Sequence, residues 1–197
     1  MIDQLYSSTN DLKIAESTIK KMSDTTNFTE MQELWQNYLM RIERSWDHAV
    51  SILQKKKGFQ QWFKPYAVLK KKDSLLVYLK QARNAEMHNV DTTINKSLKL
   101  MIKEKTGRNF RLDSIKSNIS NGILDIDLES PDILLDMEAD IIPTDPEVVR
   151  FKCSGNWYNP PWNHLGNRIE DLHPVSLALI GLNFYKAFLS EAGNFLE

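Results

Sequence analysis

The sequence predicts an α+β protein that is mainly α: a helical bundle of three N-terminal helices and one C-terminal helix, with an inserted antiparallel β module. Apolar residues recur at helical spacing in the first half of the chain and near its C-terminus, whereas the stretch between alternates apolar and polar residues as strands do. Hydrophobic residues make up 42% of the chain and charged residues 26%, as in globular proteins. We therefore expect a helical part at 1–92, the β insertion at 93–155, and a Pro/Trp-rich loop with the closing helix at 156–197.

The first two helices are predicted from apolar periodicity and capping residues. Apolar residues at every third or fourth position predict a helix over about 9–22. The second helix is expected to begin at Asn27, because an asparagine side chain accepts hydrogen bonds from free N–H groups of the first turn. Glu30 stands where a capping box has its acid, and the apolar stripe continues until Gly58 ends the helix.

The third and fourth helices are predicted from capping residues and from a proline. A basic, aromatic connection is expected at 58–72, and Asp73 or Ser74 is suited to cap the helix that follows it. Proline is well tolerated in the first turn of a helix, so Pro174 marks the start of the closing helix. The helices on both sides of the β module are thus expected to form one bundle.

The β module is predicted from alternation and from one turn dipeptide. Strands are expected at 98–102, on both sides of Asn121-Gly122, at 134–142 and at 148–153. The Asn-Gly dipeptide favours the type I′ turn of a tight hairpin. Acids alternate with apolar residues after this turn, which is typical of a solvated sheet edge. Their spacing does not fit a calcium loop, so neither a metal site nor a cofactor is predicted.

Cysteine use and the missing targeting signals indicate the compartment. Cys153 has no partner for an internal disulfide, and we interpret it as a small core residue in a reducing environment. The N-terminus lacks the basic and apolar regions of a signal peptide. No apolar run approaches the roughly 20 residues that span a bilayer. These features predict a cytoplasmic protein without a membrane partner.

Residues 83–88 read R-N-A-E-M-H and fit the pattern R-N-x3-H. Two other pairs satisfy the wider pattern R-x4–6-H, namely Arg41 with His48 and Arg168 with His173. Only the first stretch has asparagine after its arginine and lies on a strongly patterned helix. Arg41 and His48 share one face of a predicted helix, so they stay an alternative.

Through this motif the chain resembles the HEPN superfamily, the helical domains of many prokaryotic toxins and defence ribonucleases. The resemblance covers the motif with its helix, and more loosely the long helix before it and the closing helix. The chain is also similar to a family of uncharacterised bacterial proteins that share A-R-N-x3-H and a later loop like Y-x-P-P-x2-H-L-G, here 158–166. The superfamily resemblance implies a metal-independent endoribonuclease with its site at a homodimer interface, and a toxin or defence role with an antitoxin as partner.

Helix geometry agrees with a site shared between two copies. Arg83 lies four residues after Leu79, at the edge of the apolar face, where a charge must be paired or lie at an interface. Arg83 and His88 diverge by about 140° around the helix, so one helix cannot aim both at one phosphate. A two-fold dimer would pool both groups in one cleft, as the resemblance implies.

The predicted reaction needs no metal, because RNA carries its own nucleophile, the 2′-hydroxyl. Histidine, with an ordinary pKa of about 6.5, suits proton transfer, which we assign to His88. Arginine binds phosphate bidentately, so Arg83 would stabilise the phosphorane and Asn84 would position the substrate. The expected products are a 2′,3′-cyclic phosphate and a 5′-hydroxyl. Glu86 is expected either to pair with Arg83 or to lie in solvent.

Charge is distributed unevenly along a chain whose formal net charge is −1. Residues 55–72 hold seven lysines and no acid, whereas residues 121–149 hold nine acids and no base. Lysines can bind phosphates and aromatic rings can stack on unpaired bases. The same lysines can equally be solvated surface, and the aromatic residues can cap the bundle. The candidate RNA-binding residues are Lys64, Lys70, Lys71, Lys72 and Trp62.

Two other classes of function compete with the ribonuclease. The first is a non-catalytic dimeric module that binds a nucleotide, RNA or a protein partner. The second is metal-assisted hydrolysis around His164 and His173, although their spacing matches no familiar set of ligands. Loss of RNA cleavage in variants of His88 and Arg83 would separate the ribonuclease from both.

Overall fold

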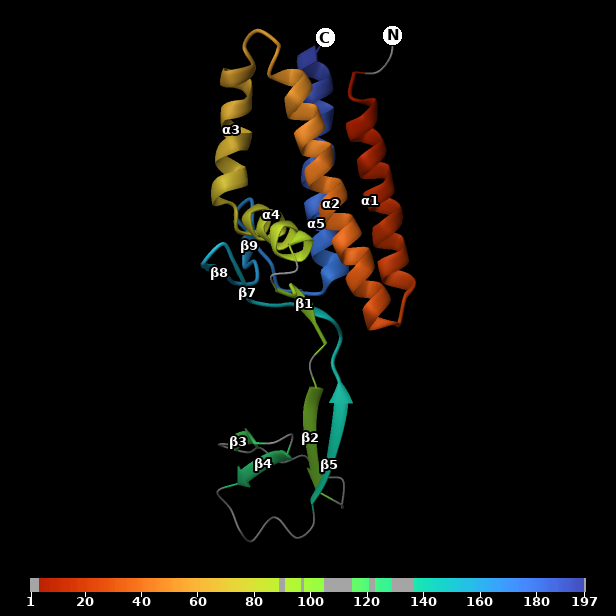
Figure 1. The fold of residues 1–197 in the computed structure, drawn as a ribbon, viewed down its shortest axis with the longest axis vertical. Helices are drawn as coiled ribbons and strands as arrows, with labels where there is room; N and C mark the ends of the chain where they lie inside the picture. Colours follow the sequence, from red (N-terminus) through yellow and green to blue (C-terminus); the bar gives the residue numbers. More distant parts are fainter. Residues whose placement is uncertain are drawn as a thin grey trace. The chain divides into compact units, whose positions relative to one another are not determined.

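The computed structural model describes residues 4–88, 91–96, 98–104, 115–120, 123–128 and 137–196 (Figure 1). Within these residues the protein has five helices and short two-stranded antiparallel sheets, so the predicted mainly α class is confirmed. The chain divides into two compact units. One unit combines 1–96 with 145–197, and the other comprises 97–144. The unit that holds all the helices therefore also contains some strands that were expected in the β insertion.

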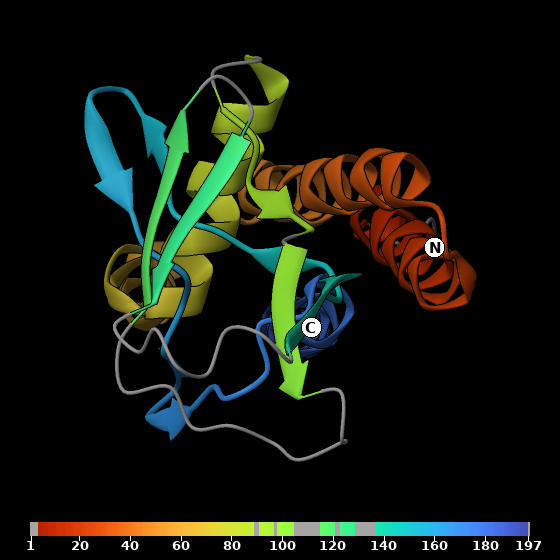
Figure 2. The same ribbon diagram turned by 90° about the horizontal axis from the view of Figure 1, so that it is seen from below.

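The bundle is built on two long helices that lie side by side, α1 (Tyr6–Asp24) and α2 (Phe28–Leu53), and on α5 (Pro174–Leu196), which packs against both (Figures 1 and 2). Asn27 caps α2 as predicted, since its side chain accepts hydrogen bonds from the N–H groups of Thr29 at 2.9 Å and Glu30 at 3.3 Å. The Glu30 carboxylate does not complete a capping box there, because it accepts from the Thr25 hydroxyl instead.

The expected connection at 58–72 is wrong, because the residues Phe59–Lys72 form a helix, α3. Pro65 lies inside this helix, where a proline removes one backbone hydrogen bond and crowds the preceding turn. The aromatic residues nevertheless recur at helical spacing, and burying them outweighs the proline. Phe59 is buried, and Trp62, Phe63 and Tyr66 pack against the same core. The bundle thus has four N-terminal helices, the last being α4 (Ser74–Met87).

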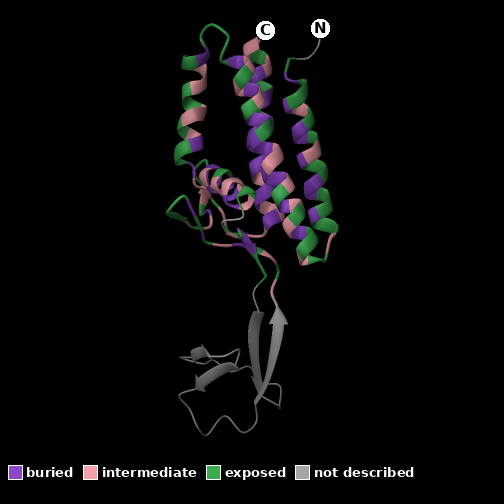
Figure 3. Ribbon diagram, viewed as in Figure 1, coloured by how far each residue is buried: buried purple, intermediate pink, exposed green. Residues whose placement is uncertain are grey.

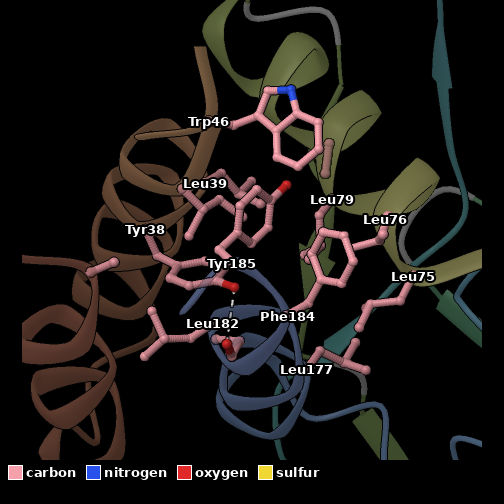
Figure 4. Packing of buried hydrophobic residues seen from close by; sticks show 14 of the residues in the cluster. Tyr38, Leu39, Trp46, Leu75, Leu76, Leu79, Leu177, Leu182, Phe184 and Tyr185 are labelled. Carbon is pink, nitrogen blue, oxygen red and sulfur yellow. Dashed lines mark hydrogen bonds between the residues drawn. The ribbon is translucent and has the colours of Figure 1, made fainter. Parts of the chain in front are cut away.

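Aromatic side chains from several helices fill the core, and Figure 3 shows buried residues on the faces that the helices turn toward each other. Trp46 of α2 stacks on Phe188 of α5, with 4.1 Å between the ring centroids. Tyr38 is fully buried, and its hydroxyl donates to the carbonyl of Ala178 at 2.9 Å, the bond dashed in Figure 4. Leucines of α4 complete this packing, which fixes α4 against α2 and α5.

The described residues of the helical unit also include two tight hairpins. Strand β7 (Phe151–Cys153) pairs with β8 (Asn156–Tyr158), and β9 (Asn163–His164) pairs with β10 (Asn167–Arg168). Each hairpin has two connecting residues, and both have positive φ, as a type I′ turn requires. Their φ angles are 49° and 81° at Ser154-Gly155 and 49° and 85° at Leu165-Gly166. In addition, β1 (Ile94–Asn95) pairs with β6 (Glu147–Val148).

The described residues of the second unit form two antiparallel pairs. Strand β2 (Leu98–Glu104) pairs with β5 (Met137–Pro143), and β3 (Ile115–Ser120) pairs with β4 (Ile123–Leu128). Ser120 lies opposite Ile123, so the predicted hairpin between these strands is confirmed. The turn residues 121–122 and the outward direction expected for the acidic side chains lie outside what the structure describes.

Candidate functional site

Helix α4 carries the R-N-x3-H stretch and is held firmly at its N-terminus. Asp73 caps it as predicted, since its carboxylate accepts from the N–H groups of Leu75 and Leu76, both at 3.1 Å. Leucine and alanine side chains on its inner face are fully buried. The helix ends at Met87, and the N–H of His88 donates to the Asn84 carbonyl at 3.3 Å. The motif therefore occupies the last turn and a half of a helix whose other face is core.

Glu86 fastens this C-terminal turn to the rest of the unit. Its carboxylate accepts from the N–H and hydroxyl of Thr93, at 2.8 and 2.6 Å, and from the side-chain amide of Gln36 at 2.9 Å. The hydroxyl of Thr93, which is buried, also accepts from the indole N–H of Trp35. The expectation that Glu86 pairs with Arg83 or lies in solvent is wrong. Its role is to hold the end of α4 against α2 and the segment before β1.

Arg83 is held only loosely. One guanidinium nitrogen lies 3.8 Å from the Asp47 carboxylate of α2, and the side chains are 32% and 64% exposed. An ion pair this long and this exposed contributes less than about 1 kcal/mol. Partial burial and the nearby Glu43 raise the pKa of Asp47, although Arg83 opposes this. Asp47 could not be predicted as the partner of Arg83, because no local pattern relates a residue of α2 to one of α4.

The remaining motif residues lie at the surface of the bundle. His88 is exposed, and its imidazole makes no hydrogen bond or ion pair within the described part of the chain. Asn84 is half-buried and its amide donates to Gln81, three residues earlier on the same helix, at 3.4 Å. Met87, between them in sequence, is 54% exposed.

The alternative pair on α2, Arg41 and His48, lies beside the buried carboxylate of Asp11. Asp11 of α1 is 1% exposed and binds both Arg41, at 3.0 Å, and Arg44, through two nitrogens. His48 lies on the same side, with Nδ1 3.6 Å from the Asp11 carboxylate. Burial by itself would raise the pKa of Asp11, but the hydrogen bonds from Arg44 and Arg41 lower it below its usual 3.8. These charges join α1 to α2.

The Asp11 cluster gives a testable dependence of stability on pH. A carboxyl whose pKa is lower in the folded state stabilises the fold above its unfolded pKa and loses that contribution as pH falls through its folded pKa. We expect Asp11→Asn to lower the free energy of unfolding by about 1.5–3 kcal/mol at pH 7, because hydrogen bonds to charged groups are lost. Urea titrations from pH 7 to pH 2 should show the difference from wild type shrinking below pH 4. A difference independent of pH would contradict this account.

The third match to the wider pattern, Arg168 with His173, is divided between two elements. Arg168 is exposed on β10. His173 immediately precedes α5, and its Nδ1 accepts from the Val175 N–H at 3.3 Å. The Asp171 carboxylate accepts from the His173 N–H and the Ser176 hydroxyl, so this stretch caps α5.

Lys70 was predicted to be one of the RNA-binding residues, but it is buried. It is only 8% exposed, and its ammonium donates to Glu43 and to the Tyr185 hydroxyl at 2.6 Å. The Trp46 ring lies 5.1 Å from the same ammonium. Burial lowers the pKa of Lys70, although Glu43 opposes this. Lys70 faces inward from α3 and is not placed to contact a nucleic acid.

The other candidates divide into exposed lysines and a packed tryptophan. Lys64, Lys71 and Lys72 are exposed. Trp62 is half-buried and packs against Tyr66, Phe188 and Phe195, with its ring centroid 4.9 Å from that of Phe195. Its role is therefore to cap the bundle and not to stack on unpaired bases, the two interpretations that the sequence allows.

The remaining candidate groups are Cys153, His164 and possible metal ligands. Cys153 is buried and free, as its interpretation as a core residue predicted. His164 is buried, and its Nδ1 lies 2.9 Å from the Asp73 carboxylate. Among the described residues, no group of three or more His, Cys, Asp or Glu is placed to hold a metal ion, so the alternative of metal-assisted hydrolysis finds no ligand set there.

Comparison with protein-family models, with curated proteins and with solved structures finds no match to this chain. The resemblance to the HEPN superfamily therefore stays a prediction based on the motif. No helix in the described part of the chain has both the length and the apolar character needed to cross a bilayer.

Proposed function

We propose that this protein is a metal-independent RNA endonuclease that acts as a homodimer, with Arg83, Asn84 and His88 in its active site. The proposal includes a cytoplasmic location and a role in a toxin–antitoxin or defence system, as in the superfamily that the motif resembles. Binding of RNA, a nucleotide or a protein by a non-catalytic dimer is the competing function.

One observation supports the choice of this site. Of the three R-x4–6-H pairs, only Arg83 and His88 have a guanidinium and an imidazole that both make little or no contact with other polar groups of the described chain. Arg41 is bound to a buried carboxylate, and Nδ1 of His173 is used to cap α5. Arg83 has one long contact to an exposed acid, and the His88 imidazole has no partner in the described part of the chain. Arg83 and His88 are therefore the pair whose polar groups are available to a substrate.

Each residue would have a separate task in the reaction. His88 would take the proton from the 2′-hydroxyl as it attacks the adjacent phosphorus, and the His88 of the second copy would return a proton to the leaving 5′-oxygen. Arg83 would exchange its weak contact with Asp47 for a bidentate contact with the phosphorane oxygens. The amide of Asn84 would hold the substrate through hydrogen bonds. Atoms balance without a water molecule, because the 2′-oxygen displaces the 5′-oxygen and a cyclic phosphate remains.

The surface at this end of α4 supports the proposed dimer. A single helix directs Arg83 and His88 about 140° apart, so a second copy is needed to complete the site. Met87 is exposed between them and offers apolar surface that a second copy would cover. Glu86 and Thr93 would keep the helix end rigid during association, because they join it to the body of the unit.

The test is cleavage of single-stranded RNA in the presence of EDTA. We expect His88→Ala and Arg83→Ala each to lower the cleavage rate at least about 100-fold, since general acid–base catalysis contributes roughly 100- to 10,000-fold. The products should carry a 2′,3′-cyclic phosphate and a 5′-hydroxyl, which acid hydrolysis and end labelling by a kinase would identify.

Arg168→Ala is the matched control, because it removes an exposed arginine from the pattern of the same spacing at 168–173. It should cleave like the wild type. Mixing His88→Ala with Arg83→Ala chains should restore part of the activity if the two copies share one site. Intact RNA with the wild-type protein, or equal cleavage by all variants, would rule out the proposed site. Binding without cleavage would favour the competing function.

A further inference from the structure

A groove of about 340 Å³ lies beside the start of α4, on a different part of the unit from the last turn of that helix that carries His88. It is formed by the C-terminal end of α3, the first turn of α4, the β7–β8 hairpin and the loop that follows it. Figure 1 shows these segments gathered around α4. The residues that matter most among those lining it are Lys71, Lys72, Trp157, Tyr158, Asn159 and Trp162.

Two tryptophans are exposed at this groove. Trp162 is 70% exposed and Trp157 is 55% exposed, although each indole carries a large apolar surface. Trp62, in contrast, is packed against aromatic neighbours. Indole surface left in water in two places along one groove indicates a surface that is covered when the protein is bound to its partner.

The fold holds these rings in place by anchoring their backbone. The Ser74 hydroxyl, at the start of α4, accepts from the Trp162 N–H at 2.9 Å, and the Ile169 N–H donates to the Trp162 carbonyl at 3.0 Å. The same loop is fixed a few residues later by Asp73, which accepts from the N–H of Leu165 at 2.8 Å. The Y-x-P-P-x2-H-L-G stretch is thus a platform that presents an indole beside the first turn of α4.

Positive charge surrounds the groove. Lys71 and Lys72 line it and are exposed, and no acid is among the described residues that line it. Arg150 and Lys152 lie over the Trp157 ring, with 4.3 and 6.0 Å from their charged ends to its centroid. The guanidinium of Arg150 is in cation–π contact with that indole. An anionic polymer with flat aromatic groups matches both features.

We propose that this groove binds unpaired nucleotides of single-stranded RNA, with bases stacked on Trp157 and Trp162 and the flanking phosphates on Lys71 and Lys72. The choice of RNA rests on the proposed function, whereas the groove itself is argued from its own residues. It would hold a part of the strand remote from the scissile bond. This explains why two lysines of the predicted RNA-binding set lie away from the motif, and it adds two tryptophans that the sequence did not single out.

Stacking and phosphate binding together favour RNA over a lipid surface or an acidic peptide. Base stacking on an aromatic ring is tolerant of sequence, and the lysine contribution weakens steeply with salt. A lipid surface would use the indoles as amphipathic anchors at the level of the headgroups and would provide no flat ring to stack on them. An acidic peptide would use the lysines but would have no flat group for both rings.

The experiment measures binding of a fluorescein-labelled 2′-O-methyl uridine 12-mer, which cannot be cleaved through its 2′-oxygen. Fluorescence anisotropy with the full chain should show Trp157→Leu and Trp162→Leu each weakening binding at least about fivefold, and Trp162→Phe retaining most of the affinity. Lys71→Ala/Lys72→Ala should lower the slope of log Kd against log salt by about 1.4, since each phosphate contact in a single strand contributes about 0.7.

Matched controls are Tyr6→Ala, which removes an exposed aromatic ring on α1, and Lys55→Ala/Lys56→Ala, which removes two exposed lysines before α3. Both should bind like the wild type. Wild-type affinity in the two leucine variants, or binding only to vesicles of phosphatidylserine and phosphatidylcholine, would overturn the proposal. Because the probe is uncleavable, loss of binding in the tryptophan variants would support the groove even if the cleavage test failed. If His88→Ala abolished cleavage while the groove variants bound RNA normally, the proposed active site would be supported and the proposed groove overturned.

Discussion

Glu43→Ala should lower the free energy of unfolding by about 3–5 kcal/mol, because it leaves the buried ammonium of Lys70 without its counter-charge. Lys70 donates to Glu43 and to Tyr185, and the Tyr185 hydroxyl donates to the same carboxylate oxygen. Glu43 and Tyr185 are only 2% and 1% exposed, so water cannot replace the lost contact without opening the bundle. Urea denaturation followed by circular dichroism measures the effect.

A second substitution separates charge from packing in this prediction. Adding Lys70→Met to Glu43→Ala removes the orphaned charge and fills its space, which should restore most of the lost stability, since replacing a buried ion pair by apolar groups is often nearly neutral. Asp47→Ala is the matched control, one turn along the same helix but 64% exposed in its side chain, and it should change stability by less than about 1 kcal/mol. Equal effects of Glu43→Ala and Asp47→Ala would mean that Lys70 is solvated.

Gly181→Val should destabilise the fold by about 3 kcal/mol or more, because α5 has no room for a side chain at this point. A Cβ atom at Gly181 would lie 2.6 Å from the Tyr38 hydroxyl oxygen and 2.7 Å from a methyl carbon of Leu79. Neither group can move away cheaply, since both residues are fully buried and the Tyr38 hydroxyl donates to Ala178. Gly181 therefore lets α2 and α4 approach α5 closely.

Gly193 of the same helix provides the control, because a Cβ atom there would meet nothing within 4 Å. Gly193→Val should leave stability unchanged or raise it by a few tenths of a kcal/mol, since most residues are better helix formers than glycine. Thermal unfolding of both variants would show the contrast directly. If both lowered the melting temperature equally, the cause would be valine's poor fit to a helix and not the close packing at Gly181.

These two predictions concern the packing that fixes α4, and α4 positions both candidate RNA surfaces. Leu79 of α4 contacts the Gly181 region, and Asp47, one turn beyond Glu43, is the partner of Arg83. A loosened core would shift the end of the helix that carries His88. Cleavage assays on any variant should therefore be accompanied by a measure of folding, so that loss of the site is distinguished from loss of the fold.

Local sequence was sufficient for most helices and for the hairpin of the second unit. Asn27 and Asp73 cap α2 and α4 as predicted, and Pro174 begins α5, because capping depends on residues within one turn. Strands β3 and β4 were predicted from alternation on either side of one dipeptide. The same local reasoning failed at α3, because the aromatic stripe of this helix is buried against α5, which is distant in sequence.

The candidate site was predicted only in part. Helical spacing placed Arg83 at the edge of the apolar face, and the structure agrees, since Arg83 is partly buried. Spacing could not supply Asp47 as the partner of Arg83, nor Thr93 and Gln36 as partners of Glu86, because these come from other elements. The exposed indoles of the groove lacked any periodic signal, since they stand on a hairpin and a loop.

By itself the sequence determined the mainly α class, the starts of α2, α4 and α5, and the motif at residues 83–88, because periodicity and capping act between residues a few positions apart. Only the tertiary structure decided which charges are buried and which are free. Lys70 and Lys71 are neighbours in one basic run, yet Lys70 meets Glu43 and Tyr185, which lie 27 and 115 residues away in sequence, whereas Lys71 faces solvent. The free energy of a charge depends on what surrounds it in space, and those surroundings exist only once the helices have packed.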